Sequence, residues 1–111
     1  MGKRTILIDL DGVFNTYTGS YDEKFIPPLK DGADVFLEKL AEKFDLKLFT
    51  TRSKVLVEKW CKDNDIMHYF SEITNVKKMA WLIIDDRCIK FDGNYQLMLS
   101  KILEFKPWYK S

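Results

Sequence analysis

Short apolar runs alternate along this chain with stretches of helical periodicity, and this alternation restricts the fold more than any other feature. The runs at residues 5–10 (TILIDL) and 81–84 (WLII) are typical of strands buried on both faces of a sheet. Residues 46–49 are predicted as a further strand, 68–73 as a weaker one, and 88–91 as a candidate for a short fifth one. Strands that alternate with helices predict a parallel sheet with right-handed crossovers.

Three amphipathic helices are predicted from the spacing of apolar residues. The clearest opens at Asp31, a reasonable N-cap, and its apolar stripe consists of Ala33, Phe36, Leu37, Leu40, Ala41 and Phe44. The second covers about residues 53–63, with Leu56, Val57, Trp60 and Cys61 on its inner face. The last starts near Asn94 and is expected to pack Tyr95, Met98, Leu99 and Ile102. The expected fold class is α/β: a three-layer, Rossmann-like parallel sheet with helices on both faces.

The length and the charge of the chain limit its organisation and its partners. A chain of 111 residues has room for one domain, so we expect residues 1–111 to form a single one. The net charge of +1 comes from interspersed acidic and basic residues, so charge alone indicates no membrane partner. The charge does not indicate nucleic acid as a partner either, although it does not exclude one. The composition says nothing about the oligomeric state.

Cysteine usage and the first residues both favour a cytoplasmic location. Cys61 and Cys88 form no CxxC pair, and two reduced thiols are expected of a domain that needs no disulfide. The apolar run near the N-terminus is short and soon broken by carboxylates, which is unlike a signal peptide or a membrane span.

Reactive groups follow the predicted strands at the points where those strands end. Asp9 and Asp11 close the first strand, Thr50 closes the second, and Asp85 and Asp86 close the run at 81–84. The carboxyl ends of parallel strands meet at one edge of the sheet, which is where ligands bind in such folds. We therefore expect four carboxylates to converge there, and such an oxygen-rich site suits magnesium.

Further polar residues near these strand ends are candidates for holding a phosphoryl group. Lys77 and Lys78 lie just before the run that carries Asp85, and Thr50 offers a hydroxyl. Carboxylates, a metal ion, a lysine and a hydroxyl are sufficient for phosphoryl transfer, which needs mostly positioning and neutralisation of charge. Three neighbouring residues are candidates either for binding substrate or for an ordinary solvated surface: Thr51, Arg52 and Arg87.

Four ordered segments resemble the motifs of the haloacid dehalogenase (HAD) superfamily of hydrolases. They are ILIDLDGVF, LKLFTTR, Lys77 ahead of WLIIDD, and IIDDR, and they span residues 5–87. The resemblance implies a magnesium-dependent phosphatase that forms an aspartyl-phosphate on Asp9. It implies Asp11 as general acid and then base, with its backbone carbonyl also on the metal. It further implies Asp85 as a direct Mg²⁺ ligand and Asp86 as a ligand through water or an indirect partner.

The same resemblance assigns roles to the remaining motif residues and to the chain between them. Thr50 would contact the phosphoryl group, as would a lysine, and spacing favours Lys77 over Lys78. Only 38 residues separate Asp11 from Thr50, and 26 separate Thr50 from Lys77, so the resemblance is to the class without a cap domain. The flap (residues 13–30), whose Pro27-Pro28 excludes a helix there, is the only covering element expected.

Other sites and other functions fit these residues less well. A calcium loop of the EF-hand type needs glycine where Phe14 stands, and a receiver domain has its acids and lysine in the reverse order. A catalytically silent module of the same fold, which binds or regulates without turnover, is the alternative function. The substrate is expected to be a phosphorylated small molecule or a macromolecular end. We favour the latter, or a nucleotide, because the flap is too short to enclose a metabolite.

Overall fold

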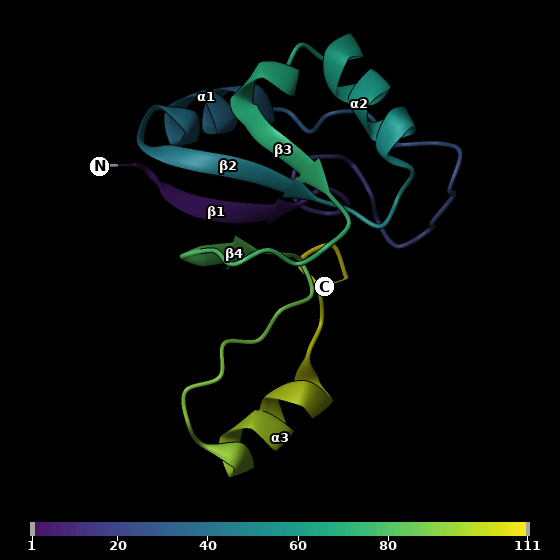
Figure 1. Ribbon diagram of the computed structural model, residues 1–111. Helices are drawn as coiled ribbons and strands as arrows, with labels where there is room; N and C mark the ends of the chain where they lie inside the picture. The colour runs from purple at the N-terminus through teal and green to yellow at the C-terminus, as the bar shows by residue number, and fades with distance from the viewer. Residues whose placement is uncertain (1, 111) are drawn as a thin grey trace.

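The computed structural model describes residues 2–110 and contains a parallel four-stranded sheet in the order β3-β2-β1-β4 (Figure 1). The strands are β1 (Arg4–Asp9), β2 (Phe44–Phe49), β3 (Phe70–Thr74) and β4 (Leu82–Ile84). The helices are α1 (Ala33–Lys43), α2 (Lys54–Asp63) and α3 (Tyr95–Glu104), with a 3₁₀ turn, η1 (Met67–Tyr69), before β3. The predicted α/β class with a parallel sheet is confirmed.

The hydrophobic core lies between the sheet and the first two helices. Ile6 and Ile8 of β1 are paired with Leu46 and Leu48 of β2, so these four side chains face the same way. They form one buried cluster with Leu37 of α1 and with Val57 and Cys61 of α2. Both helices therefore cover the same face of the sheet, as right-handed crossovers towards one edge require. The expected inner face of α2 is confirmed.

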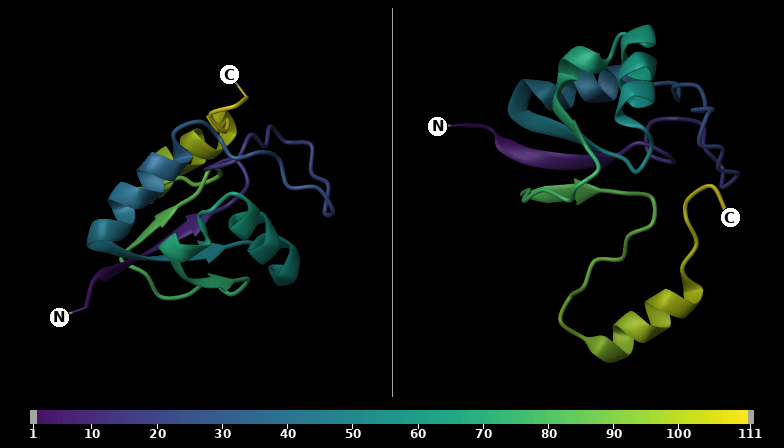
Figure 2. Two further views of the ribbon diagram at one scale, coloured as in Figure 1. Left: turned by 90° about the horizontal axis from the view of Figure 1, so that it is seen from above. Right: turned by 45° about the vertical axis from the view of Figure 1, so that its right-hand side comes forward.

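The second helical layer that we expected on the opposite face does not form. The chain passes from β3 at one edge of the sheet to β4 at the other through residues 75–81, which contain no helix. α3 lies well apart from the sheet and has no buried residue (Figures 1 and 2). The expected packing of Tyr95, Leu99 and Ile102 is therefore wrong, because residues 85–94 lead the chain away from β4 before the helix begins.

Several local expectations need correction. Gly32, in a left-handed conformation with φ 88°, is the N-cap of α1 in place of Asp31. Phe36 and Trp81 were expected in the core, yet both are exposed, and Trp81 stacks instead on Phe44 with ring centroids 5.6 Å apart. Residues 88–91 form no strand because they have left the sheet edge.

The flap has no helix or regular strand, as expected, and it is pinned at its base. An isolated bridge joins Asn15 to Leu29, and Lys30 donates its backbone N–H to the carbonyl of Phe14 over 3.0 Å. The side chains of Phe14 and Ile26 are buried in the main core and anchor the flap there. Among residues 2–110, no helix combines the length and the apolar character needed to cross a membrane.

Candidate functional site

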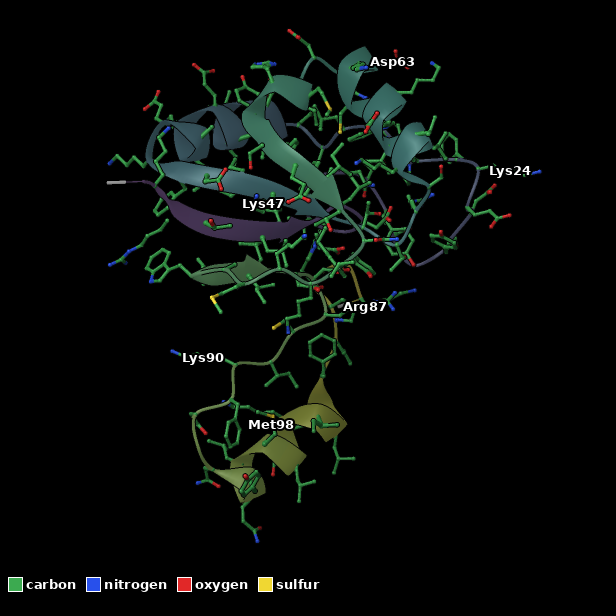
Figure 3. All side chains as sticks on the ribbon, viewed as in Figure 1. Lys24, Lys47, Asp63, Arg87, Lys90 and Met98 are labelled. Carbon is green, nitrogen blue, oxygen red and sulfur yellow. The ribbon has the colours of Figure 1, made fainter. Side chains whose placement is uncertain are left out.

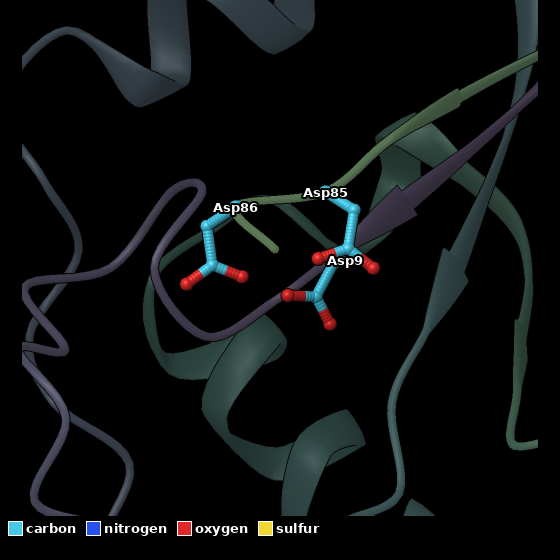
Figure 4. Close-up of side chains that lie close together, drawn as sticks. All are labelled: Asp9, Asp85 and Asp86. Carbon is cyan, nitrogen blue, oxygen red and sulfur yellow. The ribbon is translucent and has the colours of Figure 1, made fainter. Parts of the chain in front are cut away.

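Three aspartates meet at the carboxyl edge of the sheet. Ile8 of β1 is paired with Ile84 of β4, so the residues that follow, Asp9 and Asp85, leave the sheet side by side. One carboxylate oxygen from each of Asp9, Asp85 and Asp86 lies within 4.8 Å of the other two (Figure 4). The strand ends thus bring together three of the four carboxylates expected at this edge.

The electrostatics of this cluster favour a positive charge. The pKa of Asp9 is raised from 3.8 to about 8, first by burial and then by the charges of Asp85 and Asp86. Burial and like charges both disfavour ionised Asp9 unless a cation is close. Three carboxylates, one of them exposed, form an all-oxygen donor set with room for water, which is the environment that magnesium prefers. The residues present therefore fit a hard divalent cation.

Asp11 lies beside this cluster but is not part of it. Arg52 donates to both of its oxygens, from Nε to Oδ2 over 2.8 Å and from Nη2 to Oδ1 over 3.1 Å. The side-chain amide of Asn15 donates to Oδ1 over 3.0 Å. Both oxygens of Asp11 therefore accept hydrogen bonds, and Oδ2, which accepts only from Arg52, keeps a lone pair for a further partner.

Arg52 is buried and connects several parts of the site, so we call it the brace. The alternative that it is an ordinary solvated surface residue is wrong. Only 4% of the residue is exposed. Its Nη1 donates to the carbonyl of Asp22 in the flap over 2.7 Å, and its guanidinium lies 4.6 Å from the ring centroid of Tyr21. Its backbone N–H donates to the hydroxyl of Thr50 over 3.1 Å. Arg52 thus ties the end of β2 to the first strand end and to the flap.

A pocket of about 240 Å³ opens over the aspartates. Its lining residues are Asp9, Asp11, Tyr17, Tyr21, Thr51, Asp85, Asp86 and Arg87. Arg87 lies where the chain leaves β4 (Figure 3), and its Nη2 donates to the hydroxyl of Tyr17 over 3.3 Å. The wall of the pocket therefore contains one basic side chain, Arg87, which is hydrogen-bonded to the flap residue Tyr17.

Two of the predicted catalytic residues lie outside this pocket. Thr50 is buried and lines a neighbouring pocket of about 180 Å³ with Arg52 and Lys54. Lys77 is exposed in the helix-free segment 75–81 and lines neither pocket. Lys78 lies 3.7 Å from a carboxylate oxygen of Glu72. The catalytic role of Lys77 stays a prediction that this arrangement does not support.

Sequence analysis missed residues that hold the site together. Asn15 is fully buried, and its Oδ1 accepts from the backbone N–H groups of Gly12 and Tyr17, each over 3.1 Å. Tyr109 donates its hydroxyl to Oδ2 of Asp86 over 2.8 Å, and the indole of Trp108 donates to the carbonyl of Gly12 over 2.6 Å.

Gly12 is required where β1 turns into the site. Its φ of 82° lies in the left-handed region, which residues other than glycine rarely adopt. A Cβ atom at this position would also collide with the carboxylate of Asp86. The glycine of the DLDG segment therefore lets the loop approach the acid that follows β4.

Comparisons with known proteins give no relative for this chain. No family model matches it, and no match was found among curated proteins or among solved structures. The functional argument consequently depends on the motif residues and on the geometry just described.

Proposed function

We propose that this protein is a magnesium-dependent phosphatase that forms an aspartyl-phosphate on Asp9 and belongs to the capless HAD class. The observation that carries the proposal is the cluster of Asp9, Asp85 and Asp86 at the carboxyl edge of the sheet. The four motif segments supply the order of residues, and the strand register supplies their convergence. Together these support phosphoryl transfer more than any other chemistry.

Asp9, Asp85 and Asp86 are the residues that would hold the metal ion. When bound, magnesium would neutralise part of their charge and polarise the oxygens of a phosphoryl group. Asp9 would then be ionised at neutral pH, although burial and its neighbours oppose this. The raised pKa of Asp9 thus keeps its carboxyl group protonated, and therefore a poor nucleophile, when no cation is bound.

Asp9 acts as the nucleophile in the first step. One of its carboxylate oxygens attacks phosphorus, and the bond between phosphorus and the leaving oxygen breaks. The leaving oxygen takes a proton, and water then attacks phosphorus and releases phosphate and Asp9. Arg87, in the wall of the pocket, is placed to bind a phosphate oxygen. It supplies the positive charge that Lys77 does not bring to the pocket.

Asp11 is the proton donor and acceptor in this proposal, and Arg52 positions it. The fork of Arg52 fixes the orientation of the Asp11 carboxylate beside the pocket. Oδ2 of Asp11 accepts only from Arg52 and keeps a lone pair, through which Asp11 would give a proton to the leaving oxygen and later take one from the attacking water.

A phosphatase screen with the Asp9→Asn variant tests the proposal. Magnesium with nucleotides, sugar phosphates, phosphopeptides and 3′- or 5′-phosphorylated oligonucleotides covers the substrate classes. We expect turnover by the wild-type protein, none by Asp9→Asn, and unchanged turnover by Asp31→Asn, an exposed aspartate at the start of α1. Equal turnover by the wild type and Asp9→Asn would overturn the mechanism.

A silent binding module is the second candidate, and two observations favour it. Arg52 donates to both oxygens of Asp11, and Lys77 lies outside the pocket. If Arg52 keeps Asp11 from exchanging a proton, the protein would bind magnesium and phosphate without turning over a substrate. Calorimetric binding of magnesium and inorganic phosphate, without hydrolysis of any substrate in the screen, would select this candidate.

A further inference from the structure

The helical arm (residues 88–107) exposes more large apolar side chains than a free surface normally does. The exposed side chains are Phe91, Tyr95, Leu97, Leu99, Ile102, Leu103 and Phe105. Tyr95, Leu99, Ile102 and Leu103 recur at helical spacing and share one face of α3. Leu103 is 87% exposed and Tyr95 77% exposed, so nothing within residues 2–110 covers this face. Apolar patches of this kind mark interaction surfaces.

α3 is too short to be stable without a partner. It has 10 residues, none of them buried, whereas isolated helices shorter than about 12–15 residues are marginal in water. Asn94 caps its first turn by accepting from the N–H of Leu97 over 3.0 Å, which stabilises the helix only modestly. Most of the stability of such a helix comes from packing of its apolar face. The arm therefore needs a surface to pack against.

Both ends of the arm are fixed at the functional site, so the arm projects as a loop and not as a loose tail. Before it, Arg87 contacts Tyr17, and after it, Trp108 and Tyr109 bind Gly12 and Asp86. Figure 1 shows α3 held away from the sheet between these two ends. Figure 3 places Met98 on that helix, far from the sheet. The exposed face is thus held away from the core that α1 and α2 cover.

Area and charge both favour a second copy of this chain as the partner. The side chains of Tyr95, Leu99, Ile102 and Leu103 together expose roughly 500 Å², so a symmetric pair would bury about 1,000 Å² in total, the least that a specific interface needs. The arm carries three lysines and two acidic residues, so two copies would not repel one another. The same near-neutrality gives no attraction to nucleic acid or to an anionic membrane.

We propose that two copies of this chain associate through their α3 arms into a symmetric dimer. Each copy presents Tyr95, Leu99, Ile102 and Leu103 to the same residues of the other, as an interface with twofold symmetry requires. The proposal does not depend on phosphatase activity.

The test compares the full-length wild-type protein with a double variant, Leu99→Glu with Leu103→Glu, in analytical ultracentrifugation. We expect the wild type to sediment as a dimer and the double variant as a monomer. The control is Ser100→Glu, which adds one negative charge to α3, where the double variant adds two, but away from the apolar face; it should remain dimeric. A wild type that is monomeric at every concentration, or a dimer that persists in the double variant, would overturn the proposal.

A second measurement keeps the proposal testable if the double variant unfolds. The melting temperature of a dimer rises with protein concentration, whereas that of a monomer does not. We expect the wild-type melting temperature to rise on concentration, together with hydrogen-exchange protection of the α3 amides. Protection of α3 that is independent of concentration would show that the arm folds back onto its own sheet, and would refute the dimer.

Discussion

Tyr109 donates a hydrogen bond from its hydroxyl to Oδ2 of Asp86 over 2.8 Å, although 23 positions separate the two residues. The ring of Tyr109 also packs edge-on against Tyr17 of the flap, with centroids 5.8 Å apart. The C-terminal residues thereby orient a predicted metal ligand and touch the flap at the same time. These two contacts connect the C-terminal residues, the aspartate cluster and the flap, which the strand order alone does not connect.

Replacement of Tyr109 by phenylalanine should therefore weaken the site without unfolding the protein. Loss of one hydrogen bond to a carboxylate costs about 1.5–3 kcal/mol in the free energy of unfolding, while the ring that remains keeps its packing. Magnesium affinity should fall as well, because Asp86 loses its orientation. Urea unfolding and calorimetric titration of magnesium measure the two effects.

The matched control is Tyr69→Phe, whose hydroxyl makes no hydrogen bond to any other described residue. Its magnesium affinity should equal that of the wild type. If both tyrosine variants bind magnesium as tightly as the wild type, Tyr109 does not position Asp86.

Arg52→Ala should be the most destabilising single change at the site. It removes the two guanidinium donors to Asp11, leaves only the Asn15 amide, and leaves the half-buried carboxylate without its cation. Loss of one partner of a buried ion pair costs about 3–5 kcal/mol. Arg52→Lys should recover only part of this, because an ammonium group cannot reproduce the two-donor fork.

Chemical denaturation of both variants measures this series. The comparison variant is Lys59→Ala, which removes an exposed ion pair with Asp63 and should change stability by less than about 1 kcal/mol. A similar small loss in Arg52→Ala would show that the brace does not contribute to the fold.

The acid cluster was predictable because its residues follow apolar runs that the sequence shows directly. Asp9 and Asp85 each end such a run, parallel pairing puts all strand ends at one edge, and the pairing of β1 with β4 makes these two neighbours. Arg52 was not predictable in the same way. Its sequence neighbours indicate a strand end, but its burial results from Asp11, Asp22 and Tyr21, which reach it only in the folded chain.

The third helix shows the limit of periodicity as evidence for packing. The spacing of Tyr95, Leu99 and Ile102 predicted a helix, and α3 begins within one residue of the expected start at Asn94. The same spacing cannot say which surface covers the apolar face, because that depends on the path of residues 85–94 away from β4. Secondary structure was therefore predicted correctly here and the layer to which it belongs was not.

Magnesium should stabilise the protein, and the effect should require Asp85. A ligand that binds only the folded state raises its stability by mass action, by about 2.7 kcal/mol at a hundred times the dissociation constant. Asp85→Ala removes an exposed member of the cluster and should abolish the magnesium-dependent rise in melting temperature. Asp31→Ala should respond like the wild type. An unchanged response of Asp85→Ala would place magnesium elsewhere.

Asp9 should make the metal-free protein less stable as pH rises. Its pKa is raised from 3.8 to about 8 on folding, so between these values the folded state keeps a proton that the unfolded state has lost. Stability falls with pH wherever the folded state binds more protons, so the contribution of Asp9 is lost between about pH 4 and pH 8. Screening at the half-exposed cluster limits this loss to roughly 2–4 kcal/mol.

The Asp9→Asn variant isolates this contribution, because an asparagine carries neither the proton nor the charge. In the presence of a chelator, the variant and the wild type should have similar unfolding free energies at pH 4. At pH 8 the variant should be more stable than the wild type. Magnesium should reduce that difference, since a cation beside Asp9 lowers the cost of ionising it. Urea unfolding at the two pH values, with and without magnesium, gives four free energies for each protein. A difference between the two proteins that does not change with pH would show that Asp9 ionises as readily in the folded chain as in the unfolded one, and the cluster would then have no need of a cation.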